Sequence, residues 1–236
     1  MNKQSDKSSG VRAVVVLSGG QDSATCLALA CRRFTPERVA AITFSYGQRH
    51  ALETEYAQHL AKDIFRVCAW LEVPLDFYSS VTDNALMNPE RPITRADNAK
   101  CPNTVVEGRN AIFLQIAAVW AKRLGATFLY TGVSETDFSG YPDCREAFIK
   151  AQQRAIRLAL DYPIRILTPF MHMTKADEWA LADSLGVLDI IKHHTLTCYN
   201  GVPGSGCGAC PACLLRNRGL AEFERGTQST PPPPSA

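Results

Sequence analysis

The chain has 236 residues, of which 46% are hydrophobic and 20% are charged, so it is long and apolar enough to bury the core of one globular domain. A formal net charge of +2 falls short of the strongly basic surface typical of nucleic-acid-binding domains, which disfavours direct nucleic-acid binding. No apolar run approaches membrane-spanning length and no secretory leader pattern opens the sequence, so we expect a cytoplasmic protein without a membrane partner.

Short apolar runs alternate along the chain with segments of helical periodicity. Strands are expected at residues 14–17, 38–44, 70–77, 127–131 and 165–167. Helices are expected in a segment that reaches residue 31 and at residues 51–62, 108–124, 144–160 and 174–186, with Thr174 as the cap of the last. This alternation predicts an α/β fold with a doubly wound parallel sheet, which binds ligands at the carboxyl ends of its strands.

The first strand runs into a glycine-rich corner, Ser18-Gly19-Gly20-Gln21-Asp22-Ser23, and then into a helix. The glycines let backbone N–H groups approach an anion, and Ser23 is placed to cap the helix. The corner lacks the lysine of a Walker A loop, and the Asp22 carboxylate would repel phosphate unless a magnesium ion bridged them. We therefore interpret the corner as a nucleotide pyrophosphate site with magnesium, and an ordinary strand-to-helix turn is the alternative. The residues assigned to the nucleotide are Leu17, Ser18, Gly19, Gly20, Gln21, Asp22, Ser23, Ala24, Thr25, Cys26 and Leu27.

Three further segments lie where the predicted sheet would place a ligand. The first is the turn at residues 45–50, after the second predicted strand, for which a solvated loop is the alternative. The second is the helix start at residues 107–110, where Arg109 could clamp a phosphate or carboxylate; a surface arginine is the alternative. Residues 132–145 combine carboxylates, aromatics and an arginine. A purine-like base with a ring N–H beside an exocyclic amine needs such a carboxylate, and an aromatic ring to stack on. The candidate substrate-binding residues are Tyr46, Gln48, Arg49, Arg109, Asn110, Asp137, Tyr141, Asp143 and Arg145.

Lys175 opens the last predicted helix, directly after the expected cap Thr174. An ammonium group at this position could reach a leaving pyrophosphate. The alternative is an exposed lysine in a first turn, where the helix dipole slightly disfavours a cation. Lys175 and Asp22 are our two candidates for catalytic contacts.

Four of the nine cysteines crowd into sixteen residues, at Cys198, Cys207, Cys210 and Cys213. Two consecutive C-x-x-C steps let sulfur atoms converge on one ion, and four thiolates leave no open coordination position, which indicates a structural zinc. An iron–sulfur centre and accidental clustering are the alternatives. His193 and His194 could stand in as ligands, but four cysteines already suffice.

The domain organisation follows from these segments. Residues 1–10 are polar and the chain ends in a proline run, so residues 1–10 and 225–236 are predicted to be disordered tails. We assign residues 11–190 to a nucleotide-binding domain and residues 191–224 to a zinc-binding segment packed on it. Residues 78–107 lack periodicity and contain three prolines, which indicates a lid, a binding loop or local disorder.

The corner resembles the S-G-G-x-D-S motif of the PP-loop ATP pyrophosphatase superfamily, although Ala24 stands where many relatives have serine or threonine. From residue 11 to about residue 220 the chain resembles the 7-cyano-7-deazaguanine synthase family. Besides the corner and the cysteine triplet, the segments that carry this resemblance are residues 44–50 (FSYGQRH), 108–110 (GRN), 137–145 (DFSGYPDCR) and 196–201 (LTCYNG). Glu107 is a departure, because family members commonly have proline before Gly-Arg-Asn.

The resemblance implies an ATP-dependent ligase of queuosine biosynthesis, which converts 7-carboxy-7-deazaguanine and ammonia to the 7-cyano compound through an adenylated carboxylate and an amide. It further implies phosphates at the corner, magnesium on Asp22, and Lys175 against the leaving pyrophosphate. No residue need be a covalent nucleophile, so Cys144 is expected to be dispensable for the chemistry. The expected cofactors and partners are one structural zinc per chain, ATP with magnesium, ammonia and the deazapurine, and a homodimer is possible.

Two rival functions stay open at this point. One is a PP-loop enzyme that thiolates or amidates tRNA directly, against which stand the near-neutral charge and the lack of an appended RNA-binding domain. The other is a non-catalytic zinc-ribbon module whose C-terminal segment contacts a partner, which would leave the nucleotide corner without a purpose.

Overall fold

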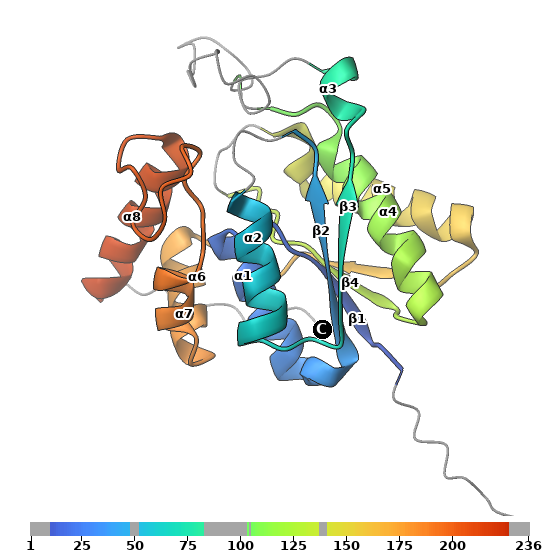
Figure 1. The fold of residues 1–236 in the computed structure, drawn as a ribbon, viewed down its shortest axis with the longest axis horizontal. Coiled ribbons are helices and arrows are strands. Elements are labelled where there is room, and N and C mark those ends of the chain that lie inside the picture. Colours follow the sequence, from blue (N-terminus) through green and yellow to red (C-terminus); the bar gives the residue numbers. More distant parts are fainter. Residues whose placement is uncertain (1–9, 48–51, 83–102, 104, 137–140, 227–236) are drawn as a thin grey trace, which may run out of the picture.

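The computed structural model describes residues 10–47, 52–82, 103, 105–136 and 141–226, and its centre is a five-stranded sheet (Figure 1). The strands are β1 (Ala13–Val16), β2 (Val39–Ser45), β3 (Ala69–Pro74), β4 (Phe128–Tyr130) and β5 (Arg165–Leu167). They lie in the order β3-β2-β1-β4-β5, and every neighbouring pair is parallel. The predicted α/β class and doubly wound parallel sheet are therefore confirmed.

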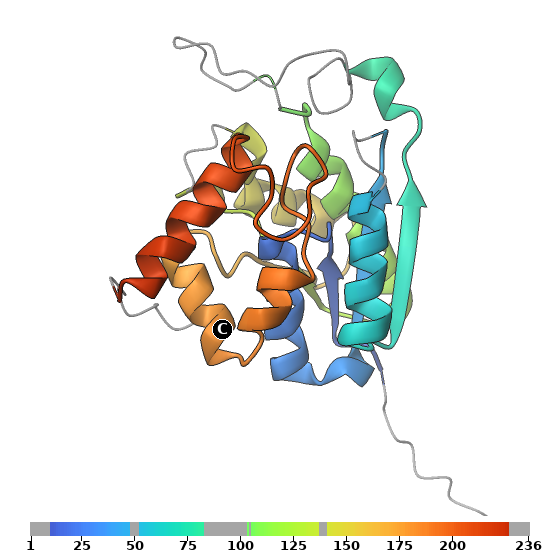
Figure 2. The same ribbon diagram turned by 60° about the vertical axis from the view of Figure 1, so that its left-hand side comes forward.

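Helices cover both faces of the sheet (Figures 1 and 2). The α-helices are α1 (Gln21–Phe34), α2 (Leu52–His59), α3 (Tyr78–Val81), α4 (Arg109–Leu124), α5 (Glu146–Leu160), α6 (Lys175–Ser184), α7 (Leu188–His193) and α8 (Pro211–Glu224). Two 3-10 turns at Pro36–Arg38 and Pro142–Cys144 and a π turn at Leu60–Ile64 complete the described elements. α4 and α5 pack on one face of the sheet, whereas α1, α2, α6 and α7 pack on the other.

The central strand β1 is buried on both faces. Because successive side chains of a strand point to opposite sides, Val14 packs with Phe113 on the α4 side, whereas Ala13 and Val15 pack with Leu27 on the α1 side. None of the three strand residues has exposed surface. Burial on both faces explains why this strand is an unbroken apolar run in the sequence.

The strand order reverses between β1 and β4. At such a switch point the loops that follow two neighbouring strands diverge and leave a crevice, where doubly wound folds bind their ligands. The loop after β4 also packs closely on the start of α1, since a Cβ on Gly132 would lie 2.9 Å from the carbonyl carbon of Asp22. The fold therefore brings the corner and the loop after β4 to one crevice.

Most predicted elements agree with the structure, with differences at their ends. β5 spans the predicted residues, and Thr174 caps α6 through a capping box with Asp177 as expected for a cap. β3 ends earlier than predicted, at Pro74, because the chain then turns and the Tyr78 N–H donates to the carbonyl of Leu75.

Other boundaries shift for local reasons. α5 begins at Glu146 rather than at residue 144, because Pro142–Cys144 forms a separate 3-10 turn. The first helix continues past residue 31 to Phe34. α7 and α8 were not predicted, and α8 packs against α6.

Several sequence-based predictions fall outside the described residues. These are most of the two predicted tails, with only Gly10, Arg225 and Gly226 described, and residues 83–102 and 104 of the aperiodic segment, whose described start contains α3. In the part of the chain that the structure does describe, no helix has both the length and the apolar character that a membrane span requires.

Gly219 sets how closely α8 approaches α6. A Cβ at Gly219 would overlap the Cβ of Lys175 and lie 2.9 Å from the Lys175 carbonyl carbon. We expect Gly219→Ala to lower the free energy of unfolding by about 1–3 kcal/mol, because backbone cannot yield to an added methyl as a flexible side chain can. Urea unfolding measures this, with Gly10→Ala as the control since no atom lies within 4 Å of its added Cβ. Equal midpoints for both variants would contradict the expected close packing.

Candidate functional site

The corner between β1 and α1 is held by serine hydroxyls. The Ser18 N–H donates to Ser23 Oγ at 3.1 Å, and Ser23 Oγ donates to the Gly20 carbonyl at 3.1 Å. The prediction that Ser23 caps the helix was wrong, because Gly20 is the N-cap residue and Ser23 lies inside the first turn. Its hydroxyl closes the corner instead, which leaves N–H groups at the start of α1 available to a ligand.

Gly19 is required at the tip of this corner. Its φ of +86° is a left-handed conformation, and a Cβ there would lie 2.5 Å from the carbonyl oxygen of Glu53 and 3.0 Å from the amide nitrogen of Ala57. Only glycine fits both the backbone conformation and the space. The first turns of α2 thus pack directly on the corner.

The segment before the cysteines is attached to the same corner. The Leu196 N–H donates to the Gly19 carbonyl at 2.9 Å, and the Gln21 N–H donates to Thr197 Oγ1 at 3.1 Å. Thr197 thereby caps a helix that begins 176 residues earlier in the chain. These two bonds connect the predicted metal-binding segment to the predicted nucleotide loop.

A charged cluster lies at the start of α1. Lys175 Nζ lies 2.8 Å from Asp22 Oδ1 and 2.9 Å from Glu178 Oε1, and only 7% of the lysine side chain and none of the Glu178 side chain is exposed. The alternative of an exposed lysine is therefore wrong. The Lys175 ammonium thus faces two carboxylates, and the Arg216 guanidinium of α8, which lines the same cavity, interacts electrostatically with Asp22.

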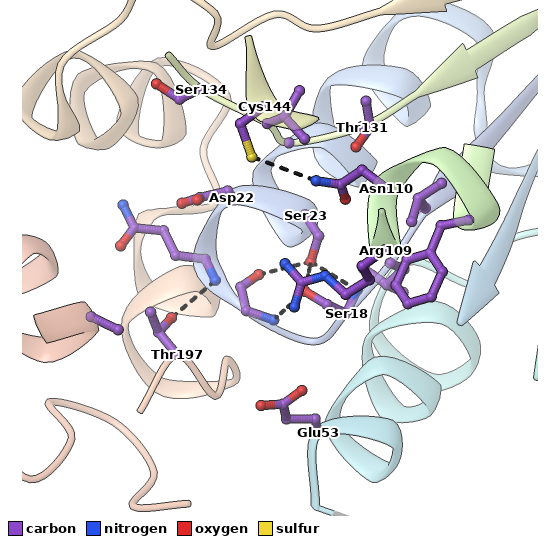
Figure 3. Close-up of a pocket in the computed structure, with 18 of the residues that line it drawn as sticks. Ser18, Asp22, Ser23, Glu53, Arg109, Asn110, Thr131, Ser134, Cys144 and Thr197 are labelled. Atoms are coloured by element: carbon purple, nitrogen blue, oxygen red, sulfur yellow. Dashed lines mark hydrogen bonds between the residues drawn. The ribbon is translucent and has the colours of Figure 1, made fainter. Parts of the chain in front are cut away.

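A cavity of about 310 Å³ opens at the switch point between β1 and β4 (Figure 3). Its walls come from the corner, the ends of β2 and β4, the starts of α2 and α4, Lys175 of α6, residues 196–199, and α8. This volume lies at the lower end of the range of about 300–1,000 Å³ for small-molecule sites. The fold therefore provides one concave site beside the corner.

One wall of the cavity is aromatic. The rings of Phe44 and Phe113 stack with centroids 4.1 Å apart, and the Arg109 guanidinium donates to the Tyr46 hydroxyl at 3.1 Å. Burial raises the pKa of the Tyr46 hydroxyl, although the Arg109 guanidinium opposes this effect. Flat rings beside a cation suit a planar, anionic ligand.

The sequence-predicted substrate residues are distributed unevenly around this cavity. Tyr46, Arg109, Asn110 and Tyr141 line it. The Asp143 carboxylate accepts the Asn110 N–H at 2.9 Å, at the start of α4, and Arg145 is exposed at the N-cap of α5. Asp143 and Arg145 are not among the lining residues. Gln48, Arg49 and Asp137 lie outside the described residues.

Of the residues assigned to the nucleotide, some line the cavity and others lie in the core. Leu17, Ser18, Gly20, Gln21, Asp22 and Ser23 line the cavity. Ala24, Thr25, Cys26 and Leu27 have no exposed surface and lie in the core behind the corner. Thr25 Oγ1 donates to the Gln21 carbonyl, one turn earlier in α1.

Four buried side-chain atoms have no hydrogen-bond partner among the described residues, and all of them belong to residues that line the cavity. They are Gln21 Oε1 and Nε2, Ser134 Oγ and Arg216 Nε. Buried polar atoms are normally paired, so unpaired ones mark a surface where a ligand or water supplies the partner.

Sequence reasoning missed several residues of this wall, namely Glu53, Ser134, Thr197, Tyr199 and Arg216. Thr197 and Tyr199 flank Cys198, so the motif around the cysteine was the available signal. Glu53 and Arg216 reach the cavity through tertiary packing and carry no local signal of it.

The four predicted metal-binding cysteines converge. The sulfur atoms of Cys198, Cys207, Cys210 and Cys213 all lie within 4.8 Å of one another and could hold a metal ion. Hydrogen bonds from the Ala209 and Cys210 amides and the Asn200 side chain lower the pKa of the Cys207 thiol to about 6, which favours the thiolate that metals bind. The set of four sulfur ligands fits a closed structural site.

The glycine-rich corner lies at the switch point of a doubly wound parallel sheet, with the Asp22–Lys175 pair beside it, and this places the chain in the class of α/β proteins whose strand-to-helix corners bind phosphate groups. The model of the family described as "Queuosine biosynthesis protein QueC" matches residues 12–224. The chain therefore belongs to this family, the 7-cyano-7-deazaguanine synthase family that the sequence motifs resemble. Membership implies an ATP-using enzyme of queuosine biosynthesis.

Three solved structures match this chain at low sequence identity. An NH3-dependent NAD synthetase from Campylobacter jejuni subsp. jejuni has 18% identity and a TM-score of 0.42 over 80% of this chain and 70% of that chain. An NMN synthetase from Francisella tularensis has 13% identity and a TM-score of 0.49, over 93% of this chain and 79% of that chain. A 4-thiouridine synthetase, solved in an RNA complex with bound ATP, has 17% identity and a TM-score of 0.49, over 93% of this chain and 52% of that chain.

Proposed function

We propose that the protein is a ligase that converts 7-carboxy-7-deazaguanine and ammonia to 7-cyano-7-deazaguanine, with two activations by ATP. The observation that carries the proposal is that the corner, the Lys175–Asp22 pair and an aromatic wall with the half-buried Arg109 share one cavity. An anionic, planar substrate and a nucleotide can therefore meet at this place.

The nucleotide fits the side of the cavity that the corner and the start of α1 form. Backbone N–H groups of the corner and the start of α1 would hold the phosphates, and Asp22 would bind the magnesium ion that ATP brings. The Lys175 ammonium lies 2.8 Å from the Asp22 carboxylate. If Asp22 held magnesium, the Lys175 ammonium would be available to neutralise the leaving pyrophosphate.

The two activations follow the same chemistry. A carboxylate oxygen of the substrate attacks the α-phosphorus of ATP, the bond to pyrophosphate breaks, and ammonia then displaces AMP with loss of a proton to give the amide. The amide oxygen attacks a second ATP, and loss of AMP and a proton leaves the nitrile. The chain's own task is to align oxygen and phosphorus, to neutralise pyrophosphate and to keep water from the adenylate.

The cysteine cluster has a structural role in this proposal. Zinc held by Cys198, Cys207, Cys210 and Cys213 would have no open coordination position, so it would supply no reaction chemistry. It would fix the segment that carries Thr197, and through Thr197 the start of α1.

The test is a reaction with ATP, magnesium, ammonia and 7-carboxy-7-deazaguanine, followed by mass spectrometry of the products. We expect the nitrile together with about two molecules of AMP for each one formed, as two adenylations require. With tRNA in place of the free base we expect no AMP. A folded, metal-loaded protein that makes neither amide nor nitrile would overturn the proposal, and AMP formed only with tRNA would favour the tRNA-modifying rival.

A further inference from the structure

Glu53 contributes a carboxylate to the cavity from the first turn of α2. In Figure 3 the Ser18 corner lies between Glu53 and Asp22, so the two carboxylates face the cavity from different sides. The close packing of α2 on Gly19 fixes the position of Glu53, whereas its side chain forms none of the hydrogen bonds that hold the corner.

The other carboxylates near the cavity are already engaged. Asp22 and Glu178 pair with Lys175, Asp143 accepts the Asn110 N–H, and Glu135 accepts the N–H of Glu146. Among the described residues, the Glu53 carboxylate forms neither a hydrogen bond nor an ion pair. Among the carboxylates that the structure describes at this cavity, Glu53 is therefore the one whose oxygens are left to accept hydrogen bonds from the base.

We infer that Glu53 reads the guanine-type edge of the substrate, accepting the ring N1–H on one carboxylate oxygen and the 2-amino group on the other. This inference rests on the proposed function and adds a specificity-determining residue to it. Two parallel N–H donors match a carboxylate bidentately, in the geometry by which arginine pairs with carboxylates. The stacked rings of Phe44 and Phe113 in the same cavity offer the flat surface that the base needs.

The shape of the base fits this assignment. In a 7-deazaguanine the 2-amino edge belongs to the six-membered ring, whereas the 7-carboxylate projects from the five-membered ring at the other end. A base with its amino edge on Glu53 therefore directs its carboxylate away from α2. In Figure 3, Ser18 and Asp22 lie on that side of Glu53.

The ionisation of Glu53 gives the assignment a pH signature. Burial raises the pKa of Glu53 to about 7, although the Arg109 guanidinium of α4 partly opposes this effect. The Tyr46 hydroxyl, which follows β2, is a second titratable group that interacts with Glu53. Two N–H bonds from a bound base favour the charged carboxylate and lower this pKa. Binding of the base should then weaken as the pH falls through about 7, because a proton must leave Glu53 before the base binds.

The test is the binding of the base without ATP, measured by calorimetry. The probes are 7-carboxy-7-deazaguanine and the analogue that lacks the 2-amino group. We expect wild-type protein to prefer the first by about 50-fold, and Glu53→Gln to lose this preference because its amide offers one acceptor and one opposing donor. Glu55→Gln, an exposed neighbour on α2, is the matched control and should keep the preference. The KM for ATP should change by less than about twofold, because Glu53 does not hold the phosphates.

Other outcomes separate this inference from the proposed reaction. If Glu53→Gln keeps the preference for the 2-amino group, or lowers only kcat as a proton-transfer group would, the assignment is overturned. Tight and selective base binding by a wild-type protein that forms no nitrile would refute the reaction but keep the assignment. Should Glu53→Gln fail to fold, Glu53→Asp takes its place, and it should bind the base more weakly while still preferring the 2-amino group. Unchanged affinity in Glu53→Asp would overturn the assignment.

Discussion

Replacing Lys175 with methionine should lower the rate of AMP formation by about 100- to 1,000-fold and destabilise the fold by about 3–5 kcal/mol. The loss of rate follows if the Lys175 ammonium neutralises the charge of the leaving pyrophosphate, because methionine carries no charge. The loss of stability follows because the Glu178 carboxylate, which has no exposed surface, would lose the ammonium that lies 2.9 Å away. Pyrophosphate release and urea unfolding measure the two effects separately.

A double variant distinguishes catalysis from folding. In Lys175→Met/Glu178→Gln no buried carboxylate is left without its partner, so most of the lost stability should return. The rate of pyrophosphate release should stay as low as in the single variant, because the charge that faces pyrophosphate is still absent. Recovery of the rate along with stability would show that Lys175 acts only as a partner of Glu178.

The sheet and the corner could be predicted because their signals are local. A strand buried on both faces needs an unbroken apolar run, and residues 13–16 supply one with no exposed surface at the first three positions. The left-handed turn at Gly19 likewise needs glycine, which the sequence displays. The spacing of the four cysteines alone predicts a metal site, and in the structure their sulfur atoms lie close together.

The remaining features depend on contacts between distant segments. α8 could not be predicted because its buried face contains Arg216 and Gly219, which are not part of an apolar pattern. The arginine donates to the carbonyls of Gly204 and Ile191, and the glycine lets α6 approach closely. Asp143 sits in a loop that favours ligand binding, yet its carboxylate accepts an amide of α4, 33 residues earlier. Glu53 has the pattern of a surface glutamate, and only the packing of α2 on the corner brings it to the cavity.

Loss of the metal should disable the nucleotide site, although none of the four clustered cysteines is among the residues that line the cavity. We expect Cys213→Ser to lose the bound metal and to weaken ATP binding at least about 10-fold, since the bonds from Leu196 to Gly19 and from Gln21 to Thr197 depend on a fixed segment. Elemental analysis, calorimetry with ATP and hydrogen exchange at residues 17–23 measure the three consequences. Cys68→Ser is the control, because Cys68 is exposed and far from the cluster in sequence.

The elemental analysis also identifies the metal. Zinc thiolates are colourless, whereas an iron–sulfur cluster absorbs visible light, so a coloured protein that contains iron would replace the zinc assignment. The coupling to ATP does not depend on that identity. Unchanged ATP affinity and unchanged exchange at residues 17–23 after metal loss would show instead that the corner holds its shape alone.

Thr197→Val tests the same coupling with the metal still bound. The variant keeps all four cysteines and the approximate shape of the side chain, but it removes the hydroxyl that accepts the Gln21 N–H at 3.1 Å. An amide left without its partner costs about 1–3 kcal/mol, so ATP affinity should fall by about 10-fold while the metal content stays at the wild-type level. Because Leu196 would still donate to Gly19, the effect should be smaller than that of Cys213→Ser. An equal or larger effect would mean that the threonine hydroxyl touches the nucleotide itself, and that the segment before the cysteines belongs to the binding site rather than to its support.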